Sequence, residues 1–234
     1  MASFYDHRIQ ITDKSFQLSE EESKHICRVL RLKENDNIQI LDGLGRIFSC
    51  TISIADPKKC QVKVQSFTED TPPPYDLHIA IAPTKNIDRI EWFVEKATEI
   101  GITEITFLSC KNSERTKINE ERIQRILVAA MKQSKRTFLP KLNGLQSFSP
   151  FVESHKNGLI AYCGELEKVS LKSALQRIDC PILIGPEGDF HPQEVTLALE
   201  NGYKTITLGE NRLRTETAAL VACVQGSLIL MNQV

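Results

Sequence analysis

Hydrophobic and polar residues follow two different spacings along this chain, and the change falls near residue 72. Before it, short apolar runs at 38–41 and 47–54 flank the loop Asp42-Gly43-Leu44-Gly45, and residues 60–67 alternate with period two. Apolar runs around a glycine-bearing loop predict a hairpin, and period-two alternation predicts a half-buried strand. We therefore expect residues 1–70 to form a small β-barrel, which closes the edges of such strands.

A short helix and a proline-rich linker complete this first segment. Ser19 and Glu22 have the spacing of a capping box, so a helix is expected from there through Ile26, Val29 and Leu30. Three prolines follow Thr71, and each fixes φ and lacks an N–H donor. Residues 71–76 are therefore predicted to be a stiff linker.

After the linker, strand-like and helix-like runs alternate to the end of the chain. Strands are predicted at 77–82, 105–108, 159–163, 181–184 and 204–208. Because helix-like runs separate them, residues 77–234 are predicted to form an α/β domain. Its sheet should be mostly parallel, with helices on both faces.

Local signals mark the ends of several of these helices. The helix after the first strand carries one apolar face, made of Ile90, Phe93, Val94 and Ala97. It should end at Gly101, since glycine readily adopts the left-handed conformation that terminates helices. Asn119 and Thr215 are expected to cap two later helices, and Pro192 to occupy the first turn of another.

Composition narrows the class of protein without naming a function. A formal net charge of −1 over 234 residues gives no global attraction to nucleic acid. No apolar run approaches the roughly 20 residues that span a membrane, and the N-terminus lacks the layout of a signal peptide. The seven cysteines are scattered without a C-x-x-C pair, so a reduced cytoplasmic protein with no metal site is expected.

Two glycine loops near the C-terminal end are the strongest candidates for a ligand site. Gly185 and Gly209 each follow a predicted strand, and ligands of parallel sheets bind outside the carboxyl ends of strands. The alternative is that both are ordinary strand-to-helix turns. Arg214 precedes a predicted helix start, where cations are disfavoured. It is therefore expected to face an anionic ligand or an acidic group such as Glu187.

Basic residues gather in the middle of the chain. Between residues 111 and 141 they are Lys111, Arg115, Lys117, Arg122, Arg125, Lys132, Lys135, Arg136 and Lys141, against Glu114, Glu120 and Glu121. This excess predicts either a phosphate-binding face or a solvated helix surface. A smaller basic group lies at His25, Arg28, Arg31 and Lys33. The remaining histidines, His7, His78, His155 and His191, are interpreted as structural or exposed.

The two glycine loops and their flanks resemble a known family. The segments Gly185-Pro186-Glu187-Gly188, Leu208-Gly209 and Leu213-Arg214-Thr215-Glu216-Thr217-Ala218 are similar to motifs of the RsmE family of 16S rRNA (uracil-N3) methyltransferases, of the SPOUT class. The resemblance extends to His25, Val29-Leu30-Arg31 and Asp42-Gly43-x-Gly45, which match its PUA-like RNA-binding domain. It covers nearly the whole chain.

The resemblance implies a site for S-adenosyl-L-methionine, built by a C-terminal trefoil knot, in a homodimer acting on 16S rRNA of the small ribosomal subunit. The cofactor-binding residues it implies are Ile184, Gly185, Pro186, Glu187, Gly188, Leu208, Gly209, Leu213, Arg214, Thr215 and Ala218. The chain departs from the pattern at Asp189, where a second glycine is usual, and at Asn211, Arg212 and Asn35. Asp and Asn tolerate positive φ better than most residues, so the turns at Asp189 and Asn35 are expected to keep their shape, while no side-chain role is expected at Asn211.

The implied reaction is methyl transfer to N3 of an unpaired uridine. Arg136 and Arg214 are candidates for anion stabilisation, and Glu187 is a candidate general base. The residues expected to contact RNA are His25, Arg28, Arg31, Arg115, Arg122, Lys132 and Arg136. Two alternatives stay open: a non-catalytic RNA-binding ribosome assembly factor, and an α/β enzyme using another nucleotide. The missing G-x-G-x-x-G argues against NAD.

Overall fold

The computed structural model describes residues 1–175 and 180–232, which form two compact units. The first unit consists of Met1–Pro72 and Met131–Leu139, and the second of Pro73–Ala130 and Pro140–Val234. The chain therefore passes between the units at three places. The sequence pattern placed 131–139 with the second domain, whereas its contacts group it with the first.

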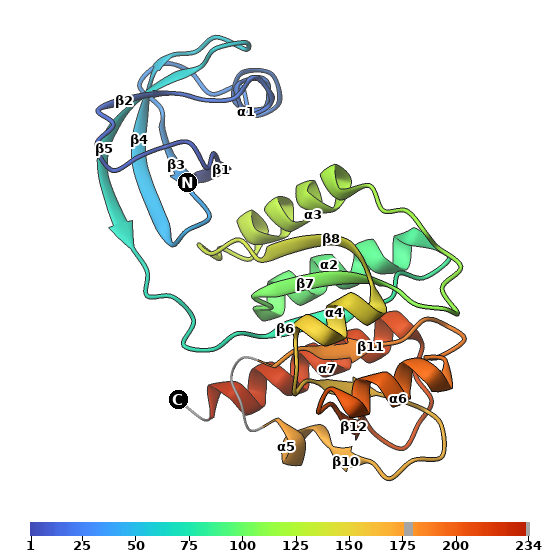
Figure 1. Ribbon diagram of the computed structural model, residues 1–234. Helices are drawn as coiled ribbons and strands as arrows, with labels where there is room; N and C mark the ends of the chain where they lie inside the picture. The colour runs from blue at the N-terminus through green and yellow to red at the C-terminus, as the bar shows by residue number, and fades with distance from the viewer. Residues whose placement is uncertain (176–179, 233–234) are drawn as a thin grey trace. The chain divides into compact units, whose positions relative to one another are not determined.

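The first unit is built on a five-stranded sheet that curls on itself in Figure 1. Its strands are β1 (Ala2–Tyr5), β2 (Ser15–Gln17), β3 (Asn37–Leu41), β4 (Arg46–Ile54) and β5 (Gln61–Glu69), in the order β1-β3-β4-β5-β2. The antiparallel pair β3 and β4 confirms the predicted hairpin. Since β1 and β2 are the two edges of this order, hydrogen bonding leaves the described sheet open, not closed as a barrel.

The helical segment of this unit differs in part from its prediction. Ser19 Oγ accepts a bond from Glu22 N at 3.3 Å, which confirms the cap of helix α1 (Glu20–Lys24). The chain then widens into the π-helix η1 (His25–Val29). The helical segment therefore runs through Ile26 and Val29 to a cap at Leu30, and of these three residues only Ile26 is fully buried, with Val29 67% and Leu30 42% exposed.

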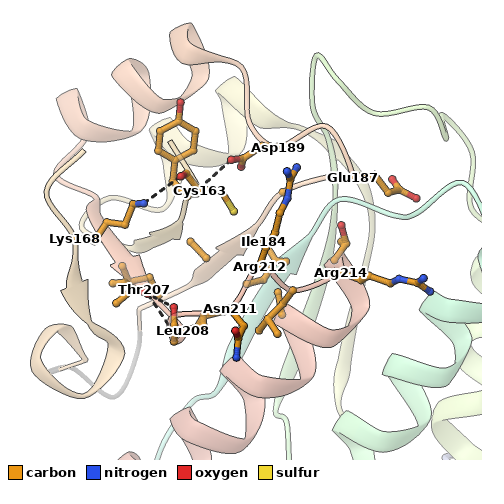
Figure 2. Close-up of a pocket in the computed structure, with 18 of the residues that line it drawn as sticks. Cys163, Lys168, Ile184, Glu187, Asp189, Thr207, Leu208, Asn211, Arg212 and Arg214 are labelled. Carbon is orange, nitrogen blue, oxygen red and sulfur yellow. Dashed lines mark hydrogen bonds between the residues drawn. The ribbon is translucent and has the colours of Figure 1, made fainter. Parts of the chain in front are cut away.

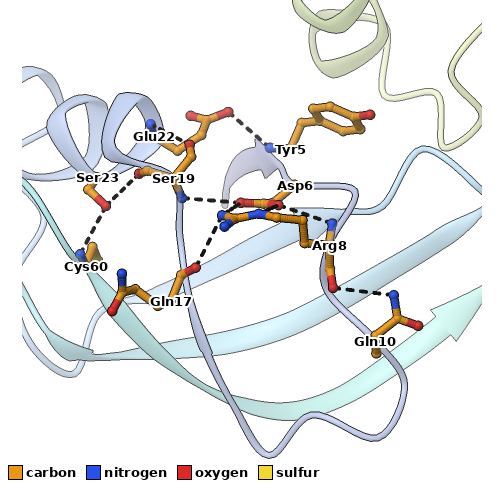
Figure 3. Close-up of polar contacts among 9 residues, drawn as sticks. All are labelled: Tyr5, Asp6, Arg8, Gln10, Gln17, Ser19, Glu22, Ser23 and Cys60. Carbon is orange, nitrogen blue, oxygen red and sulfur yellow. Dashed lines mark hydrogen bonds and ion pairs between the residues drawn. The ribbon is translucent and has the colours of Figure 1, made fainter.

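A buried carboxylate fixes the start of α1 to the end of β1 (Figure 3). Asp6 accepts bonds from Arg8 Nε at 2.8 Å and from the backbone N–H of Ser19 at 3.2 Å. Burial by itself would raise the pKa of Asp6, but the bonds from Arg8 and Ser19 outweigh it and hold the pKa below its usual value. The ionised carboxylate is thus the form that this corner of the fold stabilises.

The segment 131–139 completes the first unit by pairing with the hairpin loop. Gly45 N donates to Thr137 O at 3.1 Å, and Leu139 N donates to Gly43 O at 2.9 Å. Gly45 has a φ of +103°, and an added Cβ would lie 2.4 Å from the ring of Phe138. Glycine is therefore required here both by conformation and by the closeness of the second segment.

The second unit contains a seven-stranded sheet in which every strand pairing is parallel, as predicted. Its strands are β6 (His78–Ile81), β7 (Glu104–Ser109), β8 (Lys141–Ser147), β9 (Leu159–Ala161), β10 (Val169–Ser170), β11 (Ile182–Ile184) and β12 (Lys204–Thr207). Their order is β10-β12-β9-β11-β6-β7-β8. The chain runs outward from β6 to β8 and then builds the other half, so the order reverses between β6 and β11.

Helices cover both faces of this sheet, as predicted. They are α2 (Ile87–Ile100), α3 (Glu120–Gln133), α4 (Phe148–Ser154), α5 (Leu171–Ala174), α6 (Pro192–Glu200) and α7 (Thr215–Met231). Leu183 packs in a core cluster with residues of α4 and α6, whereas its neighbour Ile182 faces Gly226 of α7. Because successive strand residues point to opposite faces, α7 and the pair α4 and α6 lie on opposite sides. Helices α2 and α7 pack against each other.

Most predicted helix boundaries in this unit are confirmed. Gly101 ends α2 with a φ of +111°, Asn119 Oδ1 accepts from Arg122 N at 3.1 Å, and Pro192 opens α6. The predicted cap at Thr215 is wrong, because Arg214 occupies the cap and Thr215 is the first helical residue. Among the helices of the described residues, none has the length and apolar character that crossing a membrane requires.

Candidate functional site

A cavity of about 600 Å³ opens at the carboxyl ends of β9, β11 and β12, within the second unit (Figure 2). Its apolar wall includes Ala161, Ile184, Ile206, Leu208, Leu213 and Ala218. Its charged lining consists of Lys168, Glu187, Asp189, Glu210, Arg212 and Arg214. The cavity therefore lies at the edge of the sheet where the sequence predicted a ligand.

The structure brings almost all of the predicted cofactor-binding residues to this one cavity. Those that line it are Ile184, Gly185, Pro186, Glu187, Leu208, Gly209, Leu213, Arg214, Thr215 and Ala218. Gly188 is the exception, since its Cα faces Asn112. Sequence reasoning missed Tyr162, Cys163 and Lys168, which follow β9. No motif marks them, because only the position of β9 between β11 and β12 brings them here.

The first glycine loop is a tight turn whose shape depends on Asp189. This residue has a φ of +61°, as its replacement of a glycine led us to expect, and its N–H donates to Pro186 O at 2.9 Å. Its carboxylate accepts from Cys163 N at 2.9 Å and from Phe190 N at 2.8 Å. Asn112 Nδ2 donates to the carbonyls of Gly188 and Asp189. The loop is thus bonded on both sides.

The second glycine loop leaves its main chain open. Gly209 has a φ of +143°, and a Cβ added there would meet no atom within 4 Å. Thr207 Oγ1 donates to Gly209 O at 2.8 Å, and Gln225 Nε2 donates to Leu208 O at 3.3 Å. Since the backbone is held but uncovered, a ligand can approach the main chain of Gly209 closely.

The charged candidates of the site have different surroundings. Glu187 is exposed, and its Oε1 accepts from the backbone N–H of Lys85 at 2.9 Å. Arg115, predicted to contact RNA, donates instead to the carbonyls of Thr84 and Lys85 and so holds that backbone. Arg214 is exposed, and its side chain makes no hydrogen bond or ion pair within the described residues, Glu187 included. The predicted contact with an acidic group such as Glu187 is therefore not seen among the described residues.

The predicted RNA-contacting residues are distributed over both units. His25, Arg28, Arg31, Lys132 and Arg136 belong to the first unit, and Arg115 and Arg122 to the second. Lys132 pairs with Glu22 at 2.8 Å, and Arg122 pairs with Glu91. Neither Arg28 nor Arg31 has a side-chain partner in the described part of the chain. The catalytic candidates are divided too, with Arg136 in the first unit and Glu187 and Arg214 in the second.

Burial explains the shifted pKa of His78, which lies outside the cavity. Burial lowers the pKa of His78 to about 4, although Glu104 partly opposes it. Its Nε2 lies 2.8 Å from Thr106 Oγ1, so His78 is a structural histidine, as the sequence indicated. In the described ranges, no three His, Cys, Asp or Glu side chains are grouped to hold a metal ion.

Comparison with known proteins shows which family models and relatives this chain matches. The model of the RNA methyltransferase domain matches residues 71–225, and that of the RNA methyltransferase PUA domain matches residues 18–65. The chain is 31% identical to ribosomal RNA small subunit methyltransferase E of Aquifex aeolicus, over 92% of this chain and 93% of that protein. It is 30% identical to the protein of the same name from Synechocystis sp., over 94% and 75%.

Two solved structures share the whole fold. A probable rRNA-methyltransferase from Porphyromonas gingivalis is 37% identical over 100% of both chains, with a TM-score of 0.89. A putative methyltransferase from Legionella pneumophila, in complex with the bound cofactor SAM, is 25% identical over 97% of this chain and 96% of its own, with a TM-score of 0.85.

Proposed function

The chain belongs to the ribosomal RNA small subunit methyltransferase E family, and we propose that it transfers a methyl group from S-adenosylmethionine to N3 of a uridine in 16S rRNA. The supporting observation is the cavity at the carboxyl ends of β9, β11 and β12. Its volume of about 600 Å³ lies within the range of roughly 300–1,000 Å³ typical of cofactor sites. The Legionella relative of the same fold carries this cofactor.

The residues of the cavity suit such a cofactor. The space beside the backbone of Gly209 is open, so an adenine can approach it closely, although the Gly209 N–H and carbonyl already bond Thr207 Oγ1 at 3.2 and 2.8 Å. Ile184, Ile206 and Leu208 provide an apolar wall that excludes water from the ring. When bound, the cofactor supplies a methyl group on a positively charged sulfur.

The remaining chemistry falls to the charged residues at the rim. N3 of uridine carries a proton and is paired in a duplex, so the base must be unpaired and must lose this proton. Glu187, whose carboxylate is held by the N–H of Lys85, is the proposed proton acceptor. Arg214, whose side chain has no partner within the described chain, is proposed to stabilise the negative charge that develops on the base. Arg28, Arg31 and Arg136 are proposed to bind rRNA phosphates.

Mass spectrometry of rRNA nucleosides tests the reaction. The purified protein is incubated with methyl-labelled S-adenosylmethionine and small ribosomal subunits from a strain that lacks the gene. We expect label in N3-methyluridine of 16S rRNA and none in 23S rRNA offered as a control. Label in another nucleoside would replace the proposed target, and no label in any RNA would contradict the proposed activity.

We also propose that the two glycine loops are part of a trefoil knot. Strand β12 lies beyond β9 from β11, yet α7 follows it and packs against β6, β11 and α2. The connection 208–214 therefore has to return across the end of the sheet, past the β9–β11 connection. An experimental structure traced through both connections tests whether the chain threads the loop or passes outside it.

A homodimer is the third part of the proposal. Helix α7 is apolar all round, which is typical of a helix with neighbours on every side. Its side chains Val224, Leu228 and Met231 nevertheless remain exposed, Leu228 by 59%, and so does Trp92 on α2. We propose that a second copy covers them.

Sedimentation equilibrium of the wild type and Leu228→Glu tests this pairing. We expect a dimer for the wild type and a monomer for the variant, because a buried unpaired carboxylate opposes association. Arg125→Glu, a charge change at an exposed position of α3, serves as the control. A monomeric wild type would contradict the proposal.

A cytoplasmic location, where rRNA is made and assembled, belongs to the same set of proposals.

A further inference from the structure

We propose that Arg212 binds the carboxylate of the methionyl part of S-adenosylmethionine. The inference rests on the proposed function, because it assigns one end of the cavity to one end of that cofactor. The proposed contact is made by a side chain, whereas the two glycine loops contribute main-chain groups to the cavity.

The lining of the cavity is divided in the way that the cofactor is divided. Apolar residues at the ends of β11 and β12 meet the open main chain of Gly209, which suits an adenosine. Charged residues from three connections gather at the rim, which suits the amino and carboxylate groups of a free amino acid. A carboxylate taken out of water needs a cation or several N–H donors.

Three cations line the cavity, and they are not equally available. Lys168 Nζ donates to the carbonyl of Cys163 at 3.2 Å. In Figure 2 the guanidinium of Arg214 points away from the loop of Asp189, whereas that of Arg212 extends toward this loop, between Glu187 and Asp189. Arg212 is therefore the cation directed over the cavity.

The two neighbouring carboxylates already have donors. Both oxygens of Asp189 accept backbone N–H groups, from Cys163 and from Phe190. Glu187 Oε1 accepts from the N–H of Lys85. Arg212 itself forms no hydrogen bond or ion pair within the described residues. A planar guanidinium whose donors are free matches a carboxylate with two parallel hydrogen bonds.

The charge of Arg212 also reaches the far side of the cavity. Burial and the nearby Asp189 raise the pKa of the Cys163 thiol, while Arg212 and Lys168 act in the opposite direction. Cys163 follows β9 and Arg212 follows β12, so the guanidinium is close to two walls of the site. A ligand carboxylate held there would lie between the loops that follow β9 and β11.

Calorimetry with two matched ligands tests the assignment. S-adenosylhomocysteine carries the amino-acid tail, and 5′-methylthioadenosine lacks it; both are thioethers. For Arg212→Met we expect the affinity for S-adenosylhomocysteine to fall about 10- to 100-fold, the range for loss of a charge-assisted bond, with methylthioadenosine unaffected. Arg212→Lys keeps the positive charge but lacks the paired N–H donors of a guanidinium, so its loss of affinity for S-adenosylhomocysteine should be intermediate. Arg125→Met, on the surface of α3, is the control.

The other outcomes are distinct. Equal losses for both ligands would mean that the variant damages the cavity as a whole, and no loss for either would mean that Arg212 does not bind the tail. Unchanged cofactor affinity with a raised KM for the rRNA substrate would assign Arg212 to an RNA phosphate. Each of these results would overturn the inference about Arg212 but would leave the proposed function in place. Failure of the wild type to bind either ligand would instead overturn the proposed function.

Discussion

The carboxylate of Asp189 accepts a hydrogen bond from the backbone N–H of Cys163 at 2.9 Å. This bond joins the connection after β11 to the connection after β9, so two walls of the cavity are held by one side chain. A second bond, from the N–H of Phe190, fixes the same carboxylate in its own turn. The glycine expected at this position would keep the left-handed φ but could make neither bond.

Replacement of Asp189 should therefore separate conformation from bonding. Asp189→Ala loses both accepted bonds and places a Cβ residue at positive φ, so we expect a loss of about 1–3 kcal/mol in the free energy of unfolding. Affinity for S-adenosylhomocysteine should fall with it. Asp189→Asn keeps an acceptor and tolerates positive φ, so its loss should be smaller. Urea denaturation and calorimetry measure both, and an alanine variant as stable as the wild type would contradict this role.

The opening beside Gly209 predicts a loss of ligand binding on substitution. A side chain at Gly209 would meet no protein atom, so it would extend into the space reserved for the ligand. Gly209→Val should abolish measurable binding of S-adenosylhomocysteine and, because of its φ of +143°, cost about 1–3 kcal/mol of stability. Gly188→Ala is the matched control, since its Cβ would approach Asn112 no closer than 3.4 Å. Binding retained by Gly209→Val would place the ligand elsewhere.

The first unit depends on Glu22 in a way that the capping box did not foresee. Its carboxylate accepts from Tyr5 N at 3.1 Å and from Lys132 Nζ at 2.8 Å, and Glu22 is only 8% exposed. Glu22→Ala leaves these donors unpaired, so we expect a loss of about 1–3 kcal/mol in chemical denaturation. Glu20→Ala, which breaks an exposed pair with Lys24, should cost much less than Glu22→Ala, because solvent screens that pair. Equal losses would show that Glu22 acts only through helix propensity.

The buried His78 predicts a stability that falls on acidification. Burial lowers its pKa from 6.5 to about 4. Between pH 6.5 and 4 the unfolded chain therefore binds a proton at this histidine that the folded chain does not bind. Stability should decline from pH 6.5 and the decline from this group should be complete near pH 4, with a total of about 3 kcal/mol. The groups that face the imidazole act on the same window: Glu104 opposes the loss, and His155 and Lys141 favour it.

Urea denaturation between pH 7 and pH 4 measures this decline. In His78→Gln the slope between pH 6.5 and 4 should be shallower than in the wild type, whatever the absolute stability of the variant. The pKa of Glu104 is lowered in the folded state, since His78, Lys141 and Asn143 outweigh its burial, so Glu104 adds a further loss below pH 4.5. An unchanged slope in His78→Gln would assign the acid sensitivity to other groups.

The sequence predicted those parts of the fold that local signals control. The hairpin around Gly43 and Gly45, the end of α2 at Gly101 and the start of α6 at Pro192 each depend on a residue with a restricted or permissive backbone. Strand β8 was missed, because LNG and the following polar residues give no apolar run. Its place at the edge of the sheet comes from its pairing with β7, which no local pattern records.

The same limit applies to the site. The glycine motifs identified the connections after β11 and β12, because the residue types there determine the backbone conformation locally. Lys168 and Cys163 could not be found, because they reach the cavity only through the order of strands. Arg115 was predicted from charge alone, and charge does not reveal that its donors are directed to the carbonyls of Thr84 and Lys85.

The interleaving of the two units limits how this protein can be divided or recombined. A fragment ending at Pro72 would lack Thr137 and Leu139, the partners of the hairpin glycines, and Lys132, the partner of Glu22. If the N-terminal 72 residues were exchanged for those of a relative, the relative's hairpin would have to pair with segment 131–139 of this chain. Substitutions at Gly45 and Phe138 must therefore be compatible with each other although 93 positions separate them. The N-terminal unit is inherited as two distant pieces of one chain rather than as a transferable module.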